Sequence, residues 1–187
     1  EIYTLSLHDA LPISTSANRV KLFCGIISAD FEITEKALEK LENKFGAIDL
    51  RSEIVPFDFT SYYNAEMGQE LKRFWVSFQR LVFADELAAI KVFSNSAEES
   101  FAVGGKRLIN IDPGYINPAN IILASTKDFS HRIYLSQGIY AEVTLIYKKE
   151  DFIKLPWSYP DYTCAAAKNF LLKARKDLIM RLKNKSF

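Results

Sequence analysis

The sequence predicts an α+β fold: a ferredoxin-like (split βαβ) antiparallel sheet, extended by a β-hairpin and followed by a C-terminal amphipathic helix. Three observations carry this prediction. Extended and helical segments up to residue 116 alternate in the order β-α-β-β-α-β. A hairpin pattern follows, and the chain then turns to helical periodicity. Of the 187 residues, 49% are hydrophobic and 25% are charged, which is typical of a globular domain.

The first thirteen residues, EIYTLSLHDALPI, resemble the conceptual translation of a short-read sequencing adapter, codon by codon. We therefore expect residues 1–13 to be a non-native tail, residues 14–187 to form a single globular domain, and the source to be a metagenomic assembly. Setting the tail aside removes His8, so a mechanism that needs two histidines is excluded.

The first half of the domain begins with a buried strand and a capped helix. VKLFCGIIS (20–28) is a nearly continuous apolar run, which indicates a central strand. Asp30 is expected to cap the next helix, which ends at Gly46. Residues 48–63 are rich in aromatic and β-branched residues and are expected to be extended, and residues 73–83 form the next strand.

In the second half, a helix is predicted over residues 85–102, and residues 106–116 return to strand. Within them, Asp112-Pro113-Gly114 is interpreted as a turn. Residues 116–129 are expected to form a short helix with Asn117 as its cap and Pro118 at its first position.

Residues 131–149 give the strongest hairpin pattern in the chain. A three-residue loop, 136–138, with Gly138 in the left-handed region places every alternate apolar residue on one face. That face holds Ile133, Leu135, Ile139, Ala141, Val143 and Leu145. The cross-strand pairs are then Arg132 with Glu142 and Tyr134 with Tyr140.

The last segment, residues 160–183, predicts an amphipathic helix that packs against the sheet. Its apolar positions are Ala167, Phe170, Leu171, Ala174, Leu178 and Leu182.

Composition excludes several classes of protein. No run approaches the roughly 18 apolar residues of a membrane span, and the small, dispersed net charge argues against a nucleic-acid partner. Cys24 and Cys164 show no C-x-x-C spacing, which favours a reduced, cytoplasmic setting. Two cysteines and one histidine form no standard zinc set. G-x-S-x-G and P-loop motifs are absent, so no reaction, cofactor or oligomeric state is indicated.

The candidate site centres on Lys127, Asp128, His131 and Arg132, which lie within six positions, with Glu142 across the hairpin. Arginine can hold a carboxylate or phosphate with two hydrogen bonds, and histidine can carry a proton near neutral pH. The competing interpretation, favoured for Arg132 and Glu142, is an exposed cross-strand ion pair with His131 covering the hairpin.

Other candidates lie near turns. Asp112 and Tyr115 could project into a cleft beside the hairpin, with Arg107 as a further cation. Asp58 and Glu66 could act as paired carboxylates in acid–base chemistry or at a metal. LPWSYPDY (155–162) reads either as a rigid loop covering a pocket or, more simply, as a lid on the core.

Four stretches carry a family resemblance: PFDFTSYYNAEMG, GKRLINIDPGYI, LASTKDFSHRIYLSQGIYAEVTLIY and LPWSYPDY. From about Lys21 to Tyr162 the chain resembles the prokaryotic family catalogued as domain of unknown function 4416. The resemblance implies no particular activity or cofactor.

Two functions are therefore expected. The preferred one is binding of a small anionic ligand, a nucleotide or phosphorylated metabolite, by cations and carboxylates near turns. These residues are Arg132, His131, Lys127, Asp128, Glu142, Asp112, Tyr115, Arg107 and Asp58. The alternative is a non-catalytic module that docks a protein partner through an aromatic surface. Its anchors would be Tyr62, Tyr63, Trp157, Tyr159 and Tyr162.

Overall fold

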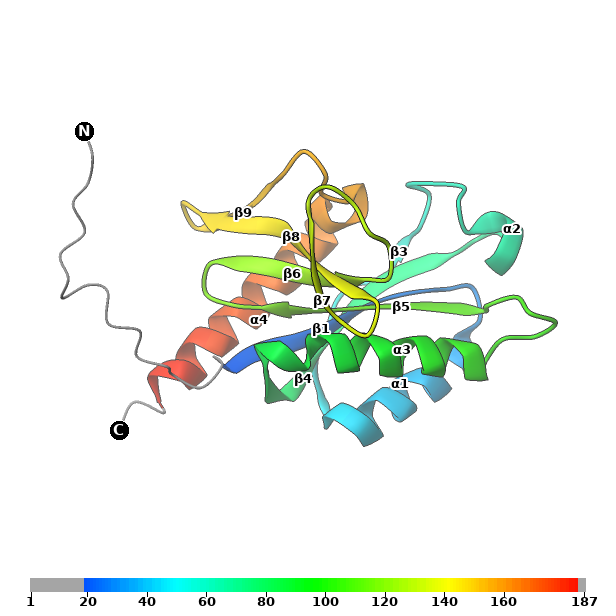
Figure 1. Cartoon of the computed structure of the whole chain (residues 1–187), viewed down its shortest axis with the longest axis horizontal. Coiled ribbons are helices and arrows are strands. Elements are labelled where there is room, and N and C mark those ends of the chain that lie inside the picture. The colour runs from blue at the N-terminus through cyan, green and yellow to red at the C-terminus, as the bar shows by residue number, and fades with distance from the viewer. Residues whose placement is uncertain (1–18, 185–187) are drawn as a thin grey trace.

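The computed structural model describes residues 19–184, which form an α+β fold around one open, antiparallel sheet (Figure 1). The predicted tail boundary at residue 14 lies outside the described residues. The described strands are β1 (Arg19–Ser28), β2 (Ile48–Arg51), β3 (Val55–Pro56), β4 (Lys72–Phe83), β5 (Ile109–Ile116), β6 (Asn120–Ser125), β7 (Arg132–Ser136), β8 (Ile139–Lys148) and β9 (Asp151–Lys154). The described α-helices are α1 (Phe31–Phe45), α2 (Asn64–Met67), α3 (Leu87–Ser100) and α4 (Ala165–Lys183). None of these helices is long and apolar enough to cross a membrane.

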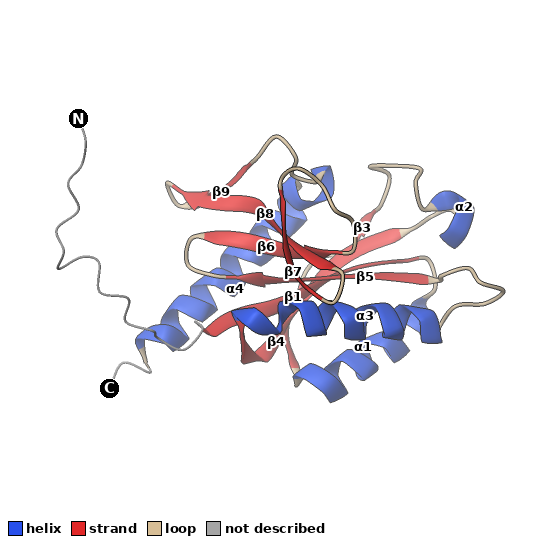
Figure 2. Cartoon of the chain, in the orientation of Figure 1, coloured by secondary structure: helices blue, strands red, loops and turns tan. Residues whose placement is uncertain are grey.

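The strand order is β2-β4-β1-β5-β6-β8-β7, with β3 added to β4 and β9 added to β8. Each pairing that joins these strands is antiparallel. Figure 2 shows α1 and α3 lying together on one side of the strands and α4 crossing them on the other. The chain is therefore layered, with helices over both faces of the central strands.

This layering explains the apolar run of β1. Successive side chains of a strand point to opposite faces. Leu22, Cys24 and Ile26 join the core under α1 and α3, whereas Phe23 joins the core under α4. Because both faces are covered, the strand is apolar at nearly every position.

The predicted start and end of α1 are confirmed. The Asp30 carboxylate accepts a hydrogen bond from the Ile33 N–H at 2.9 Å, which satisfies one of the free donors of the first turn. Gly46, with φ of 94°, follows the last helical residue. The predicted C-terminal helix is also confirmed, and its buried residues are Ala166, Ala167, Phe170, Leu171, Ala174 and Leu178.

The short helix predicted over residues 116–129 is wrong, because residues 120–125 form β6. Asn117 does use its side chain, but to close a turn. Its Oδ1 accepts from the N–H groups of Ala119 and Asn120 at 2.7 and 2.8 Å. The branched residues that follow then pack in the sheet, where their stiff side chains are favoured.

The turn predicted at Asp112-Pro113-Gly114 is also wrong, because these residues lie inside β5 and pair with β1. β5 and β6 pair only over Gly114–Ile116, so Pro113 lies where β6 does not bond. Gly114 allows β6 to approach, since a Cβ there would lie 2.5 Å from the Ile122 carbonyl oxygen.

The predicted cross-strand pairs of the hairpin are confirmed: Arg132 faces Glu142 and Tyr134 faces Tyr140. The predicted three-residue loop is wrong. Gln137 and Gly138 form a two-residue turn with φ of 54° and 75°, and an irregularity between Tyr134 and Ser136 restores the register. On the predicted apolar face, Ile139 and Leu145 are buried, but Ile133 and Leu135 of β7 are exposed.

Candidate functional site

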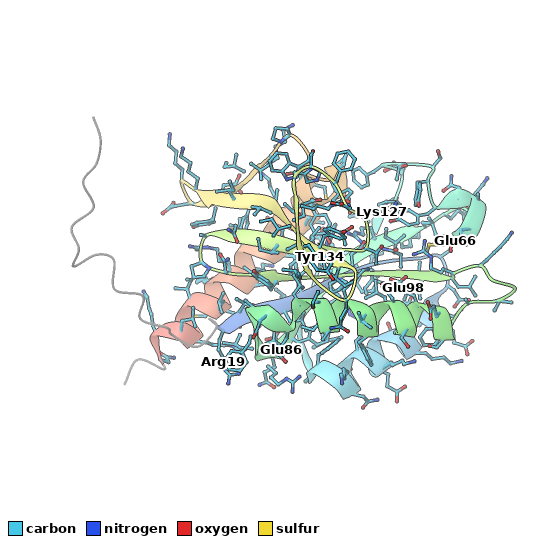
Figure 3. All side chains as sticks on the ribbon, viewed as in Figure 1. Arg19, Glu66, Glu86, Glu98, Lys127 and Tyr134 are labelled. Atoms are coloured by element: carbon cyan, nitrogen blue, oxygen red, sulfur yellow. The ribbon has the colours of Figure 1, made fainter. Side chains whose placement is uncertain are left out.

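A pocket of about 570 Å³ opens beside the point where β5 and β6 separate. Its walls come from β5, β6, α3, the segment after β3 and the segment before α4. Glu98 on α3 and Lys127 after β6, both labelled in Figure 3, line it from different elements. The pocket therefore brings together residues far apart in the sequence.

Two buried side chains of α3 satisfy the backbone of β5 next to this pocket. The Lys91 ammonium donates to the Ile111 carbonyl at 2.9 Å, and the Glu98 carboxylate accepts from the Ile111 N–H at 2.7 Å. Unpaired buried backbone groups are costly, so these charged residues replace the missing strand partner. Burial raises the pKa of Glu98.

Arg73 of β4 is the most deeply buried cation in the pocket, at 1% exposure. Its guanidinium lies 4.9 Å from the ring centre of Trp75 and 5.1 Å from that of Tyr162. Its Nη2 is 2.9 Å from the Asp161 carboxylate. Within residues 19–184, its Nε and Nη1 have no hydrogen-bond partner. Arg73 thus keeps unused donors in the interior, where an unpaired donor is costly.

Gly25 makes room for this arrangement. A Cβ at Gly25 would lie 2.7 Å from Arg73 Nη2 and 2.8 Å from the Tyr162 hydroxyl. The glycine of VKLFCGIIS therefore has a specific packing role beneath the pocket.

Asp112 is the more accessible acidic partner of Arg73, with its side chain 29% exposed. One oxygen accepts from the Asn110 amide at 2.8 Å and lies 3.5 Å from Arg73 Nη1. The other lies 3.7 Å from the Lys91 ammonium. A carboxylate flanked by two buried cations therefore faces the pocket.

Aromatic side chains of residues 57–63 form one wall. Phe57 contacts the rings of Phe59 and Tyr63, each with 5.8 Å between ring centres. Tyr62 lies edge-on to Tyr63 and beneath the Lys127 ammonium, 4.7 Å from its ring centre. This wall is anchored because Phe57 and Tyr63 pack against a small buried cluster of Ile27, Met67 and Leu71.

Arg107 joins this wall to α3. Its Nε and Nη2 donate to the two Glu66 oxygens, both at 2.7 Å, and its Nη1 donates to Glu98 at 3.2 Å. These hydrogen bonds from Arg107 lower the pKa of Glu66. Glu66 is therefore paired with Arg107. Asp58, the carboxylate that the sequence suggested as its partner, is exposed and outside the pocket lining.

The predicted hairpin cluster is present but lies mostly behind the pocket wall. Glu142 is 2.9 Å from Arg132 Nε and 3.0 Å from His131 Nε2. The Arg132 and Glu142 side chains are only 8% and 1% exposed, so the expected surface ion pair is in fact buried. His131 stacks on Trp157 with 4.9 Å between ring centres.

Of the predicted site residues, four line the pocket: Arg107, Asp112, Lys127 and Glu142. The other five are outside its lining: Asp58, Tyr115, Asp128, His131 and Arg132. Tyr115 packs against apolar core residues, and burial raises its pKa. Asp128 is exposed at the surface.

Sequence reasoning missed four charged residues of the pocket: Arg73, Lys91, Glu98 and Asp161. A signal for two of them exists in α3. Lys91 and Glu98 fall on one helical stripe with Leu87 and Ser94, and all four are buried. A charged residue on a buried helix face indicates that it is paired or hydrogen-bonded in the interior.

The segment LPWSYPDY borders a pocket and also packs on the core, so both of its interpretations stay open. Tyr159, Pro160, Asp161 and Tyr162 line it, and the Trp157 indole donates to the Val143 carbonyl at 2.8 Å. Tyr162 is 1% exposed, so it cannot serve as a surface anchor.

The model of the family described as "Domain of unknown function (DUF4416)" matches residues 18–178. Searches of the curated proteins and of the solved structures returned no match. The matched range contains every residue that lines the pocket. The chain therefore belongs to the DUF4416 family.

Proposed function

We propose that this protein binds a small metabolite with an anionic group, a phosphate or a carboxylate, in the pocket beside β5 and β6. The observation that carries the proposal is Arg73, a fully buried guanidinium with two nitrogens that lack hydrogen-bond partners within residues 19–184. Charged donors pair best with anionic acceptors, and a bound oxyanion would satisfy them.

The lining supports this function with further donors. Lys91 and Arg107 are already paired with Glu98 and Glu66, whereas Lys127, which contacts Tyr62, adds an exposed cation to the lining. Burial raises the pKa of Tyr63 and of Tyr159, so both phenols stay protonated near neutral pH and can donate hydrogen bonds. The sequence suggested that His131 and Arg132 bind the ligand directly. In this proposal they instead hydrogen-bond to Glu142, which lines the pocket.

The test is a thermal-shift screen of the protein with inorganic phosphate, phosphorylated metabolites, nucleotides, carboxylic acids and amino acids. A ligand at 100 times its Kd stabilises the folded state by about 2.7 kcal/mol, which raises Tm by several degrees for a chain of this size. The Lys127→Met variant should weaken the shift. Lys106→Met is the matched control, since Lys106 is exposed and outside the pocket lining.

Stabilisation of the parent and of Lys106→Met, with a smaller shift for Lys127→Met, supports an anion site in this pocket. Equal shifts in all three proteins would place the ligand elsewhere. A screen in which no anion raises Tm would overturn the proposal.

Docking of a protein partner is the second candidate, supported by aromatic residues that are exposed at the surface. Tyr62, Phe129, Trp157 and Tyr159 are all exposed. Phe129→Ser and Trp157→Ser, at exposed residues outside the pocket lining, would then abolish capture of a partner while leaving ligand-induced thermal shifts intact.

We also propose that the β1-α1-β2-β4-α3-β5 portion is a ferredoxin-like, split βαβ unit that the remaining strands extend. Support comes from the strand order β2-β4-β1-β5 and from the helices α1 and α3 on one face.

We also propose a cytoplasmic location, supported by the free thiols of Cys24 and Cys164.

A further inference from the structure

The charges around the pocket are balanced, which limits the ligands that fit. Four cations line it: Arg73, Lys91, Arg107 and Lys127. Four carboxylates also line it: Glu98, Asp112, Glu142 and Asp161. A ligand that carries only negative charge would leave an uncompensated charge beside buried ionic groups, which is costly. A ligand that carries both signs adds no net charge.

Arg73 and Asp112, which both line the pocket, carry opposite charges and lie side by side. Arg73 Nε and Nη1 are donors without a partner among the described residues. Asp112 is a partly exposed carboxylate 3.5 Å from Arg73 Nη1. Its second oxygen, which faces Lys91 at 3.7 Å, accepts no hydrogen bond from residues 19–184. A ligand with an anionic group and an ammonium on neighbouring atoms would match this pair. The anion would accept from Arg73, and the ammonium would donate to Asp112.

The rest of the lining is suited to an apolar ring. Phe57, Phe59, Tyr62 and Tyr63 form a continuous chain of ring contacts on one wall, and Tyr159 lines the pocket too. Aromatic side chains pack favourably against another aromatic ring, either edge-on or offset. A pocket of about 570 Å³ lies in the size range of ligand sites.

We infer that the ligand is a free α-amino acid with an aromatic side chain. Its carboxylate pairs with Arg73, its ammonium with Asp112, and its ring packs against the Phe57–Tyr63 wall. This inference rests on the proposed function, because it assigns the anionic group to the carboxylate of a zwitterion.

The test uses three matched probes: L-phenylalanine, 3-phenylpropionate, which lacks the ammonium, and 2-phenylethylamine, which lacks the carboxylate. Isothermal titration of the full chain is expected to show L-phenylalanine binding at least tenfold more tightly than either analogue. Asp112→Asn should reduce its advantage over 3-phenylpropionate to less than twofold while 3-phenylpropionate still binds. Asp128→Asn, at an exposed carboxylate outside the lining, should behave as the parent.

The outcomes separate the inference from the function beneath it. Should 3-phenylpropionate bind as tightly as L-phenylalanine, or should only phosphates bind, the amino-acid assignment fails and the anion site stands. An unchanged tenfold preference in a folded Asp112→Asn variant would also overturn it. If neither the matched probes nor the anion screen gives binding, both proposals fail. Urea unfolding of each variant checks that it is folded.

Discussion

At the scale of single residues, two glycines decide how closely the strands and side chains near the pocket approach. Gly25 lies against the Arg73 guanidinium, and Gly114 lies against the backbone of β6. Neither has a positive φ, so each is required for space and not for backbone conformation. The effect of a methyl group at each site therefore reports on packing alone.

We predict that Gly114→Ala destabilises the fold by about 1–3 kcal/mol, because its Cβ would lie 2.5 Å from a backbone oxygen and 2.8 Å from the Phe23 ring. Gly138→Asn is the control, since nothing lies within 4 Å and asparagine tolerates φ of 75°. Urea unfolding measures both. Equal stability of Gly114→Ala and the parent would contradict the packing described for β5 and β6.

The Glu66–Arg107 pair predicts a pH dependence. The pKa of Glu66 is lowered in the folded state, so its contribution to stability is present above its ordinary pKa of 4.5 and is lost as pH falls through the lowered value. The unfolding free energy of the parent should exceed that of Glu66→Gln by about 1 kcal/mol or less near pH 7. The difference should shrink below pH 4.5. A difference that stays constant from pH 7 to pH 3 would contradict this assignment.

At the scale of elements, the β7–β8 hairpin is joined to its neighbours through buried charge. Arg132 donates to Glu142 at 2.9 Å, to the Lys127 carbonyl at 2.9 Å and to the Tyr159 hydroxyl at 2.7 Å. One arginine thus connects the hairpin, the loop after β6 and the segment before α4. Three separate parts of the pocket surroundings depend on it.

We predict that Glu142→Gln destabilises the fold by about 3–5 kcal/mol, because it leaves Arg132 as an unpaired buried charge. The Arg132→Met/Glu142→Gln double variant should lose clearly less than the sum of the two single variants. A double-mutant cycle by urea unfolding measures this coupling. Additivity within about 0.5 kcal/mol would show that the two side chains act independently.

At the scale of the whole molecule, the central strands of the sheet are covered on both faces, and α4 completes one of the two cores. Phe170 and Leu171 of α4 pack with Phe23 and Trp75 of the central strands. The segment that carries Asp161 and Tyr162 leads directly into this helix. Docking of α4 therefore positions one side of the pocket.

We predict that Phe170→Ala lowers the unfolding free energy by about 3–5 kcal/mol, because it opens a cavity beneath α4. Met180→Ala, at an exposed position of the same helix, should change it by about 0.5 kcal/mol or less. Thermal or urea unfolding tests both. Similar losses for the two variants would mean that α4 does not bury the face described.

The sequence alone determined the elements whose signals are local. A continuous apolar run indicated β1, a four-residue apolar repeat with Asp30 indicated α1, and the hairpin pattern placed Arg132 across from Glu142. Periodicity and capping depend on neighbours in the chain, so they can be read without the fold. The stretch that includes Lys127 and Glu142 was proposed as a site because polar residues cluster there, and both residues line the pocket.

Only the tertiary structure decided where the pocket lies and which charges it holds. Arg73, Lys91, Glu98 and Asp161 come from three parts of the chain, namely β4, α3 and the segment before α4, and no sequence spacing relates these parts. The Asp112-Pro113-Gly114 turn failed because pairing with β1 outweighed local turn preference. The pocket opens where β5 and β6, which pair over three residues, separate, and such long-range pairing cannot be read from neighbours in the chain.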